Sequence, residues 1–299
     1  MLDIQQGGEI VTIGRPINYF GTKDRLAKRI ISLVPPECDT WVDLFCGSAI
    51  VTLRKPRHKR EVINDINGEI VNLFSVLRNT KQLTQLMKFV ELTPYAQDEL
   101  NRAQSSETPS DPVERAWHFL IVSWMGRAGS NAHRTGFRWS KGQTTAPELS
   151  WCKLPERLVS VANRLRGVCV RSVPALKLID SYDVGNCILY VDPPYPGPVG
   201  RRYKHKMNDD EHKKLAERLA QCKARVILSM NPDTIYSEIL KDWQVHRVNV
   251  TGGGTNTKQE LILTNYTAPY PLATAPKAVK FDVQAMNCLF NESGHHECS

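Results

Sequence analysis

An apolar run that ends in an acid and two prolines constrains the fold of this chain more than any other feature. Residues 187–191, "CILYV", are followed directly by "DPPYPG" at 192–197. A short, continuous apolar run predicts a buried strand of a parallel sheet, and open α/β sheets place ligand sites at the carboxyl ends of such strands. Proline lacks an N–H and fixes φ, so the turn is stiff and presents free carbonyl groups. Asp192, these carbonyls and the ring of Tyr195 together suit a planar group that carries an amine.

The order of the other predicted elements indicates a parallel sheet. A strand over 40–45 breaks into a turn at Gly47, a helix over 48–54 follows, and the next strand covers 60–64. This order predicts parallel strands joined by right-handed crossovers, and hence an α/β protein with a Rossmann-like sheet. Further strands are predicted over 168–173, 188–192, 224–230, 243–250 and 259–266, and helices over 22–34, 68–90, 96–104, 112–125, 153–166, 209–222 and 232–240. Three glycines at 252–254 separate the last two strands, which we expect to form an antiparallel pair at the sheet edge.

The basic charge of the chain is concentrated in one segment. Residues 126–171 hold nine basic and two acidic residues, and so carry +7 of the total net charge of +8. Such a concentration favours a polyanionic partner, although a solvated basic face is the alternative. We therefore predict a discontinuous core over 1–92 and 168–267, a mainly helical insertion over 93–167, and a loosely packed or disordered tail over 268–299.

Composition excludes several classes of protein. With 41% hydrophobic and 23% charged residues, the 299-residue chain is typical of a globular protein. No apolar run approaches the ~18 residues of a membrane span and no signal peptide is visible, so we expect a cytoplasmic protein with no membrane partner. The eight cysteines form no C-x-x-C pair and predict reduced thiols. The "HHEC" at 295–298 lacks spaced partners, so no metal is expected, and no interface pattern contradicts a monomer.

A second ligand-binding turn is predicted near the amino terminus. The stretch "DLFCGSAIVTL" at 43–53 bends at Gly47 but does not match the G-x-G-x-x-G of dinucleotide-binding proteins. The next strand places Asp65 where an acid can bind ribose hydroxyls, and "NYFGTK" at 18–23 places an ammonium, Lys23, where it can meet a carboxylate. The alternatives are that Asp65 caps a helix and that Lys23 lies in solvent. Together these residues outline a ligand with a nucleoside and an amino-acid part, of which S-adenosylmethionine is one.

With these pieces in order, the sequence resembles the D12 class of adenine-specific DNA methyltransferases. The resemblance runs from about Asn18 to Tyr266. It rests on six blocks in the family's order, namely "NYFGTK", "DLFCGSAIVTL", "INDINGEIVNLFSVLR", "SWMGRAG", "VDPPYPG" followed by "RRYKH", and "QELILTNY". It implies a Rossmann-like, S-adenosylmethionine-dependent methyltransferase sheet with an inserted target-recognition domain, acting in a bacterial cell or a phage-infected host, with a role in restriction–modification among the possibilities.

The resemblance also implies roles for individual residues. Lys23 and Asp43 would face the methionine end of S-adenosylmethionine, Asp65 would accept from its ribose hydroxyls, and Ile66 would lie against its adenine. The remaining cofactor-binding residues would be Tyr19, Phe45, Gly47 and Ser48. The target base would be held by Asp192, Pro193, Pro194 and Tyr195. The predicted DNA-binding residues are Arg127, Arg134, Arg138, Trp139, Lys141, Arg202 and Tyr203.

Two positions depart from the family's pattern. Ala49 stands where the family usually has a second glycine, and we expect it to crowd the cofactor turn. Pro174, in "RSVPALKLI", stands where an acid often contacts the adenine amine of the cofactor, and neither Asp180 nor Asp183 is predicted to replace it. Arg157, Arg164 and Arg166 lie on a predicted helix, either as phosphate clamps or as ordinary solvated residues.

The chemistry of adenine methylation explains the catalytic residues. If the Asp192 carboxylate and the Pro193 carbonyl each accept an N–H of the exocyclic amine, its nitrogen moves toward a tetrahedral shape and its lone pair toward the methyl donor. Tyr195 would stack on the extruded base. We therefore predict a site-specific DNA adenine-N6 methyltransferase acting on double-stranded DNA. The alternatives are an N4-cytosine or RNA-base methyltransferase, a glutamine methyltransferase, for which Asp192 is the less usual residue, and a catalytically weakened DNA-binding relative.

Overall fold

The computed structural model describes residues 13–105, 107–127, 134–140, 146–197, 200, 203–232, 234–251 and 257–268. In this part of the chain a seven-stranded sheet has the order β3-β2-β1-β4-β5-β7-β6. The strands are β1 (Thr40–Asp43), β2 (Arg60–Asn64), β3 (Val168–Arg171), β4 (Cys187–Val191), β5 (Arg225–Met230), β6 (Gln244–Thr251) and β7 (Thr257–Thr264). Strands β1 to β5 are parallel, whereas β7 runs antiparallel to both β5 and β6. The structure confirms the predicted Rossmann-like sheet and the antiparallel pair.

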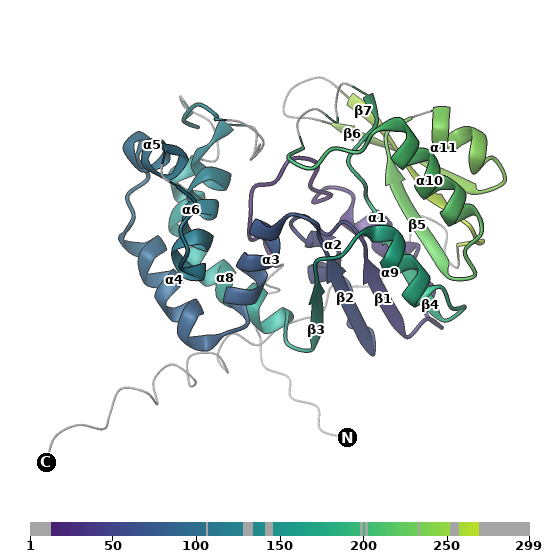
Figure 1. Ribbon diagram of the computed structural model, residues 1–299, viewed down its shortest axis with the longest axis horizontal. Helices are drawn as coiled ribbons and strands as arrows, with labels where there is room; N and C mark the ends of the chain where they lie inside the picture. The colour runs from purple at the N-terminus through teal and green to yellow at the C-terminus, as the bar shows by residue number, and fades with distance from the viewer. Residues whose placement is uncertain are drawn as a thin grey trace, which may run out of the picture.

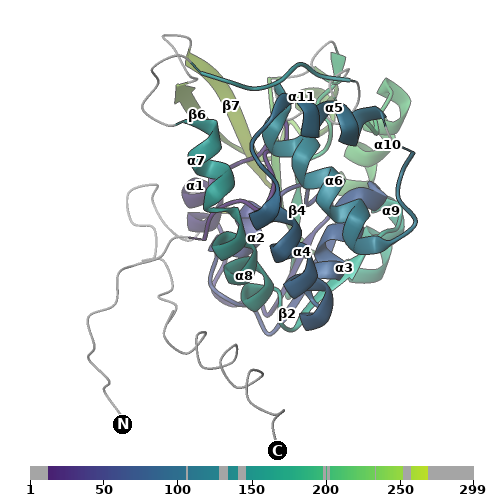
Figure 2. The same cartoon turned by 90° about the vertical axis from the view of Figure 1, so that its left-hand side faces the viewer.

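The helices divide into those that cover the sheet and those that gather beside it. They are α1 (Ala27–Ser32), α2 (Ile50–Arg54), α3 (Gly68–Leu77), α4 (Thr80–Leu92), α5 (Gln97–Ser105), α6 (Pro112–Met125), α7 (Pro147–Cys152), α8 (Leu154–Arg164), α9 (Ala175–Tyr182), α10 (Asp209–Ala220) and α11 (Thr234–Ile239). Figure 1 shows α4, α5, α6 and α8 together at the β3 end of the sheet, with α10 and α11 at the β5 end. Figure 2, turned by 90°, shows α1 and α9 on opposite sides of the sheet.

Alternating side chains of the central strands pack against these two helical layers. Trp41 and Ile188 belong to the hydrophobic cluster under α1, whereas Val42 and Leu189 belong to the cluster under α9 and α10. Successive side chains of a strand point to opposite faces, so a strand that is apolar throughout is buried on both sides. This explains why the run at 187–191 carries no charged residue.

The helices of the predicted insertion do not have a separate core. One hydrophobic cluster contains Leu53 and Ile63 of the sheet layer together with Leu120 of α6 and Leu158 of α8. Helix α4, which precedes the predicted boundary at residue 93, packs against α6 and α8. The helices over 93–167 therefore share their core with the sheet, and their independence as a recognition domain stays a prediction.

Several predicted helices differ from the structure at their ends. The single helix expected over 68–90 is broken at Asn79, whose side chain accepts from the Gln82 N–H and begins a new helix, α4. Helices α7 and α9 were not among the predicted helices. Both follow a proline, Pro147 at the first helical position and Pro174 at the position before it. The tail from residue 269, including "HHEC", lies outside the described residues.

A buried ion cluster joins α8 to the sheet. Arg164 is 1% exposed and binds both carboxylate oxygens of Glu61 on β2, at 2.6 and 2.9 Å, while it also donates to the Thr52 carbonyl at 2.7 Å. Lys55, equally buried, pairs with the same carboxylate. Both interpretations of Arg164, phosphate clamp and solvated residue, are therefore wrong. Arg157 packs over the ring of Trp124 at 4.9 Å, whereas Arg166 is exposed.

Among the helices of the described ranges, none is both long and apolar enough to cross a bilayer. In the same ranges, no three His, Cys, Asp or Glu side chains converge as metal ligands would.

Candidate active site

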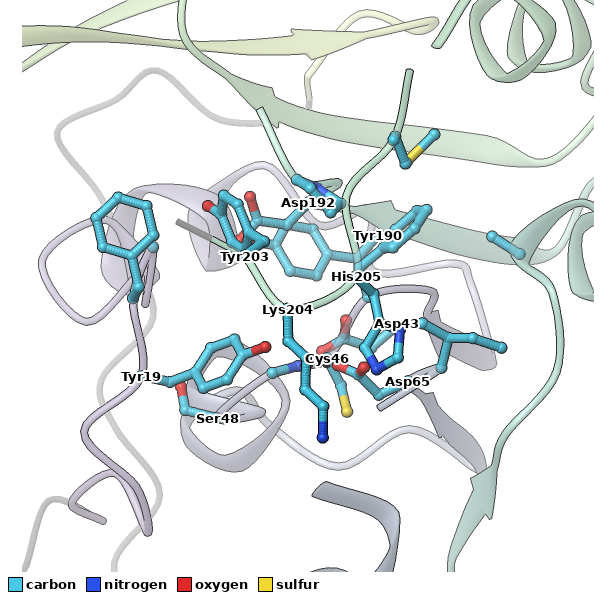
Figure 3. A pocket seen from close by; sticks show the side chains of 18 of the residues that line it. Tyr19, Asp43, Cys46, Ser48, Asp65, Tyr190, Asp192, Tyr203, Lys204 and His205 are labelled. Carbon is cyan, nitrogen blue, oxygen red and sulfur yellow. Dashed lines mark hydrogen bonds between the residues drawn. The ribbon is translucent and has the colours of Figure 1, made fainter. Parts of the chain in front are cut away.

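A cavity of about 600 Å³ opens at the carboxyl ends of β1, β2 and β4. Figure 3 shows Asp192 and Tyr203 along one side of it and Tyr19, Ser48 and Asp65 along the other. All the predicted cofactor-binding residues line this cavity, namely Tyr19, Lys23, Asp43, Phe45, Gly47, Ser48, Asp65 and Ile66. The loops that follow three neighbouring parallel strands therefore bring these residues to one place, as expected for an open α/β sheet.

The end of β1 places a buried carboxyl group in the wall of the cavity. Asp43 is 1% exposed, and its Oδ2 accepts from the Thr52 hydroxyl at 2.7 Å, which itself accepts from the Trp41 indole at 2.9 Å. Its Oδ1 has no hydrogen-bond partner within the described structure. Burial raises the pKa of Asp43 to about 8. A buried acceptor without a partner, on the wall of a cavity, suits an ammonium group of a ligand.

The turn after β1 uses two left-handed residues. Gly47 has φ +48°, and a Cβ at this position would lie 3.2 Å from the Tyr19 ring. Ala49 has φ +53° and is the only non-glycine residue of the described chain with a positive φ. It is 1% exposed within the shared core and does not line the cavity. The departure at Ala49 therefore places its methyl group in the protein interior rather than against a ligand.

Asp65 links the turn after β1 to the turn after β2. Its Oδ2 accepts from the Gly47 N–H and its Oδ1 from the Asn67 N–H, each at 2.9 Å. The cap of α3 is the side chain of Asn67, so Asp65 is not the cap of that helix. Burial raises the pKa of Asp65, while hydrogen bonds from these two N–H groups lower it. Each carboxylate oxygen keeps a lone pair for a hydroxyl group in the cavity.

The wall formed by the start of α9 is apolar. Pro174, Ala175 and Leu176 line the cavity where the resemblance would place an acid at position 174. Asp180 and Asp183 lie farther along the chain and bind the Arg218 guanidinium at 2.9 and 3.1 Å. Neither lines the cavity, in agreement with the sequence-based expectation.

The turn after β4 places Asp192 on the cavity, bound to a buried lysine. The Lys23 ammonium lies 2.7 Å from Asp192 Oδ1 and also donates to the Gly21 carbonyl at 3.0 Å. Lys23 is 5% exposed, so the alternative that it lies in solvent is wrong. Burial raises the pKa of Asp192 to about 6, while the charge and hydrogen bond of Lys23 oppose the rise.

Two of the predicted catalytic residues lie behind the cavity wall. Pro194 lines the cavity, but Pro193 and Tyr195 are buried and do not. The Tyr195 hydroxyl donates to Glu260 on β7 at 2.6 Å, and the Lys23 ammonium lies 4.7 Å from the centre of its ring. Glu260 was not predicted as a site residue, because nothing in the block "QELILTNY" indicates a contact with residue 195.

The predicted DNA-binding residues fall into two groups. Tyr203 lines the cavity, in an edge-to-face contact with Phe20 at 5.2 Å, and its hydroxyl would lie 2.3 Å from a Cβ at Gly21. The others with described positions do not line it: Arg127 follows the end of α6, Arg134 donates to the Ser105 hydroxyl at the end of α5, and the Arg138 carbonyl accepts from the Tyr95 hydroxyl. Arg127 and Arg134 are exposed, Arg138 is half-buried and Trp139 is 54% exposed, whereas Lys141 and Arg202 lie outside the described residues.

Comparison with known proteins agrees with this geometry. The model of the D12 class N6 adenine-specific DNA methyltransferase family matches residues 19–252, which is more than half of the chain. A type II methyltransferase, M.FokI, of Planomicrobium okeanokoites is 35% identical over 68 residues, which are 23% of this chain and 10% of that protein. The modification methylase StsI of Streptococcus sanguinis is 33% identical over 79 residues, 26% and 12% of the two chains. The matches thus span about a tenth of each relative. From its family match, its sheet and its cavity, the chain belongs to the D12 class of N6 adenine-specific DNA methyltransferases.

Proposed function

We propose that this protein transfers a methyl group from S-adenosylmethionine to the exocyclic amine of an adenine in double-stranded DNA. The observation that carries the proposal is that Asp192, the acid of the "DPPY" turn, lies on the same cavity as every residue expected to bind the cofactor. Methyl donor and acceptor must meet within a few ångströms, and one cavity that serves both sites supplies this proximity.

The residues of the cavity fit the cofactor. Asp43 Oδ1 is a buried acceptor without a partner among the described residues and would hold the ammonium group. Asp65 would accept from the ribose hydroxyls, and the ring system would lie between Ile66 and the apolar wall at Pro174 and Leu176. When bound, S-adenosylmethionine supplies an activated methyl group on a sulfonium. The chain must then present the adenine amine to it.

Asp192 would orient that amine. Its Oδ1 is held by Lys23, so its second oxygen can accept one N–H of the adenine. The Pro193 carbonyl, expected from the sequence as the second acceptor, does not line the cavity and would accept the other N–H only after a shift of the turn. Acceptors on the amine direct the nitrogen lone pair away from the ring and stabilise the positive charge that develops on nitrogen. Asp192 must be ionised to act in this way. With its pKa at about 6, we expect kcat/KM to rise as the pH increases through that value.

DNA binding would rest on the basic residues beside α5 and α6, together with Lys141 and Arg202. Arg127, Arg134 and Trp139 are exposed. Arginine contacts with phosphates release counterions, so each lost contact should reduce the salt dependence of binding by about one unit of slope. We expect Arg127→Ala and Arg134→Ala to weaken DNA binding without weakening cofactor binding, measured by fluorescence anisotropy at several salt concentrations.

The test of the proposal is mass spectrometry of nucleosides from unmethylated plasmid DNA incubated with the protein and S-adenosylmethionine. We expect N6-methyladenine with the wild type and with Asp180→Ala, a control whose carboxylate does not line the cavity, but none with Asp192→Ala. N4-methylcytosine would instead support the alternative base. DNA binding without any methylated base, and without heat of binding in a calorimetric titration with S-adenosylmethionine, would identify a catalytically weakened relative.

A further inference from the structure

Glu260 makes a hydrogen bond to a predicted catalytic residue, Tyr195, although it was not itself predicted to belong to the site. It lies on β7, paired with Val248 of β6, and Leu261 beside it is paired with Met230 of β5. At this point β7 is therefore held by a strand on each side, with Glu260 paired to β6 and its neighbour to β5. Its Oε2 accepts from the Tyr195 hydroxyl at 2.6 Å. A carboxylate offers only acceptors, so the tyrosine is the donor and is bound as the neutral phenol.

The Tyr195 ring in turn supports Lys23. The ring is 5% exposed, and the ammonium lies 4.7 Å from its centre, within the range of a cation–π contact. The same ammonium donates to the Gly21 carbonyl and pairs with Asp192. A ring face, a carbonyl and a carboxylate thus account for the three donor directions of Lys23.

We propose that Glu260 is a positioning residue, which acts through Tyr195 and Lys23 to fix the orientation of the Asp192 carboxylate toward the target amine. The inference rests on the proposed function, because it assigns a role in the same reaction. Glu260 does not line the cavity and does not touch the reacting atoms. It anchors the ring on which Lys23 rests, and Lys23 holds one oxygen of Asp192 so that the other faces the cavity.

The charges around Asp192 give a second consequence of this arrangement. Apart from burial, which is the largest effect, Lys23 lowers the pKa of Asp192 and Glu260 raises it. The other titratable groups that face it are Asp43, Tyr190, Tyr195 and Tyr203. Removing the negative charge of Glu260 should therefore lower the pKa of Asp192, a change that a merely structural residue would not produce.

The first test compares substitutions at the two ends of the Glu260–Tyr195 hydrogen bond with a matched control on β7. Glu260→Ala and Tyr195→Phe each remove the hydrogen bond, and we expect kcat to fall roughly 10- to 100-fold, as for a small misplacement of a catalytic group, while the cofactor Kd stays within about twofold. Because both changes break one contact, the double variant should be no slower than either single variant. Gln259→Ala, at an exposed neighbouring position, should leave kcat unchanged.

Glu260→Gln keeps an acceptor for the Tyr195 hydroxyl but removes the negative charge of residue 260. Its amide oxygen still accepts from the tyrosine, so kcat at pH 8 should stay within about threefold, whereas the acid limb of the kcat/KM profile should move to lower pH. Multiplicative effects in the double variant, or an unmoved acid limb, would overturn the proposal. NMR titration of the ¹³C-labelled Asp192 carboxyl needs no activity. If the wild type transferred no methyl group, a lowered Asp192 pKa in Glu260→Gln would still support the contact, and an unchanged one would refute it.

Discussion

At the scale of single residues, Asp43 couples the stability of the protein to its ligand. Its folded-state pKa of about 8 lies far above its unfolded value of about 3.9, so the folded state keeps a proton that the unfolded chain has lost. The contribution of this proton to the free energy of unfolding is complete below pH 4. It is lost as the pH rises toward 8, by up to about 1.4 kcal/mol per pH unit.

The substitution Asp43→Asn tests this coupling. We expect the variant to unfold in urea with a free energy that falls less than that of the wild type between pH 6 and 8, a window above the Asp192 pKa. Without a carboxylate for the ammonium, its affinity for S-adenosylmethionine should fall at least about tenfold. An equal pH dependence in variant and wild type would show that Asp43 is ionised in the ligand-free protein.

Ala49 shows how opposing energies at one residue can balance. Its left-handed conformation costs about 1–2 kcal/mol relative to glycine, but glycine would lose a buried methyl group worth about 0.8 kcal/mol and about 0.5–1 kcal/mol of backbone entropy. We therefore expect Ala49→Gly to change the free energy of unfolding by less than about 1 kcal/mol. Because Ala49 does not line the cavity, cofactor affinity should not change. A clear gain in affinity by calorimetry would contradict this placement.

At the scale of elements, the sequence pattern predicted the bounds of those strands and helices that interactions between neighbouring residues determine. The bounds of β2 and α6 agree with the prediction because a buried strand and a helix begun by Asp111 and Pro112 carry their own signals. Helices α7 and α9 are short and were not predicted, although a proline stands at the start of each, where it is compatible with a helix. Strand ends located most of the residues that are expected to bind the cofactor and that line the cavity. The contacts of Lys23 and Glu260 could not be predicted, because they join segments distant in sequence through the tertiary fold alone.

The start of α9 provides a test of the apolar wall. Pro174 is the residue before the first helical position, where aspartate is a favoured cap, and it also lines the cavity. We expect Pro174→Asp to stabilise α9 and to add an acceptor for an amine in the cavity. Its affinity for S-adenosylhomocysteine should rise a few fold, by about the 0.5–1.5 kcal/mol of one hydrogen bond, with no rise for the inosine analogue, which lacks the amine. An equal gain in affinity for both ligands would show that the new carboxylate does not contact the adenine amine.

At the scale of the whole molecule, the shared hydrophobic cluster and the buried ion cluster predict that the sheet and the helices beside it unfold together. Arg164 reaches from α8 to Glu61 on β2, and its charge and hydrogen bonds overcome the effect of burial, so the pKa of Glu61 falls to about 2. The stability from this carboxylate is present above its unfolded pKa and is lost only as the pH falls from about 4.5 toward 2.

Arg164→Met leaves Glu61 with Lys55 and with Arg57 at 3.9 Å, and it removes a buried partner, which typically costs about 3–5 kcal/mol. We expect this loss as an earlier, still single, urea transition with the same midpoint by circular dichroism and by tryptophan fluorescence, since Trp41 lies in the sheet and Trp124 and Trp151 among the helices. Because one core spans both parts, weakening their ionic link should destabilise both equally. Two separate midpoints would instead show that residues 93–167 fold as an independent domain, as the charge pattern first indicated.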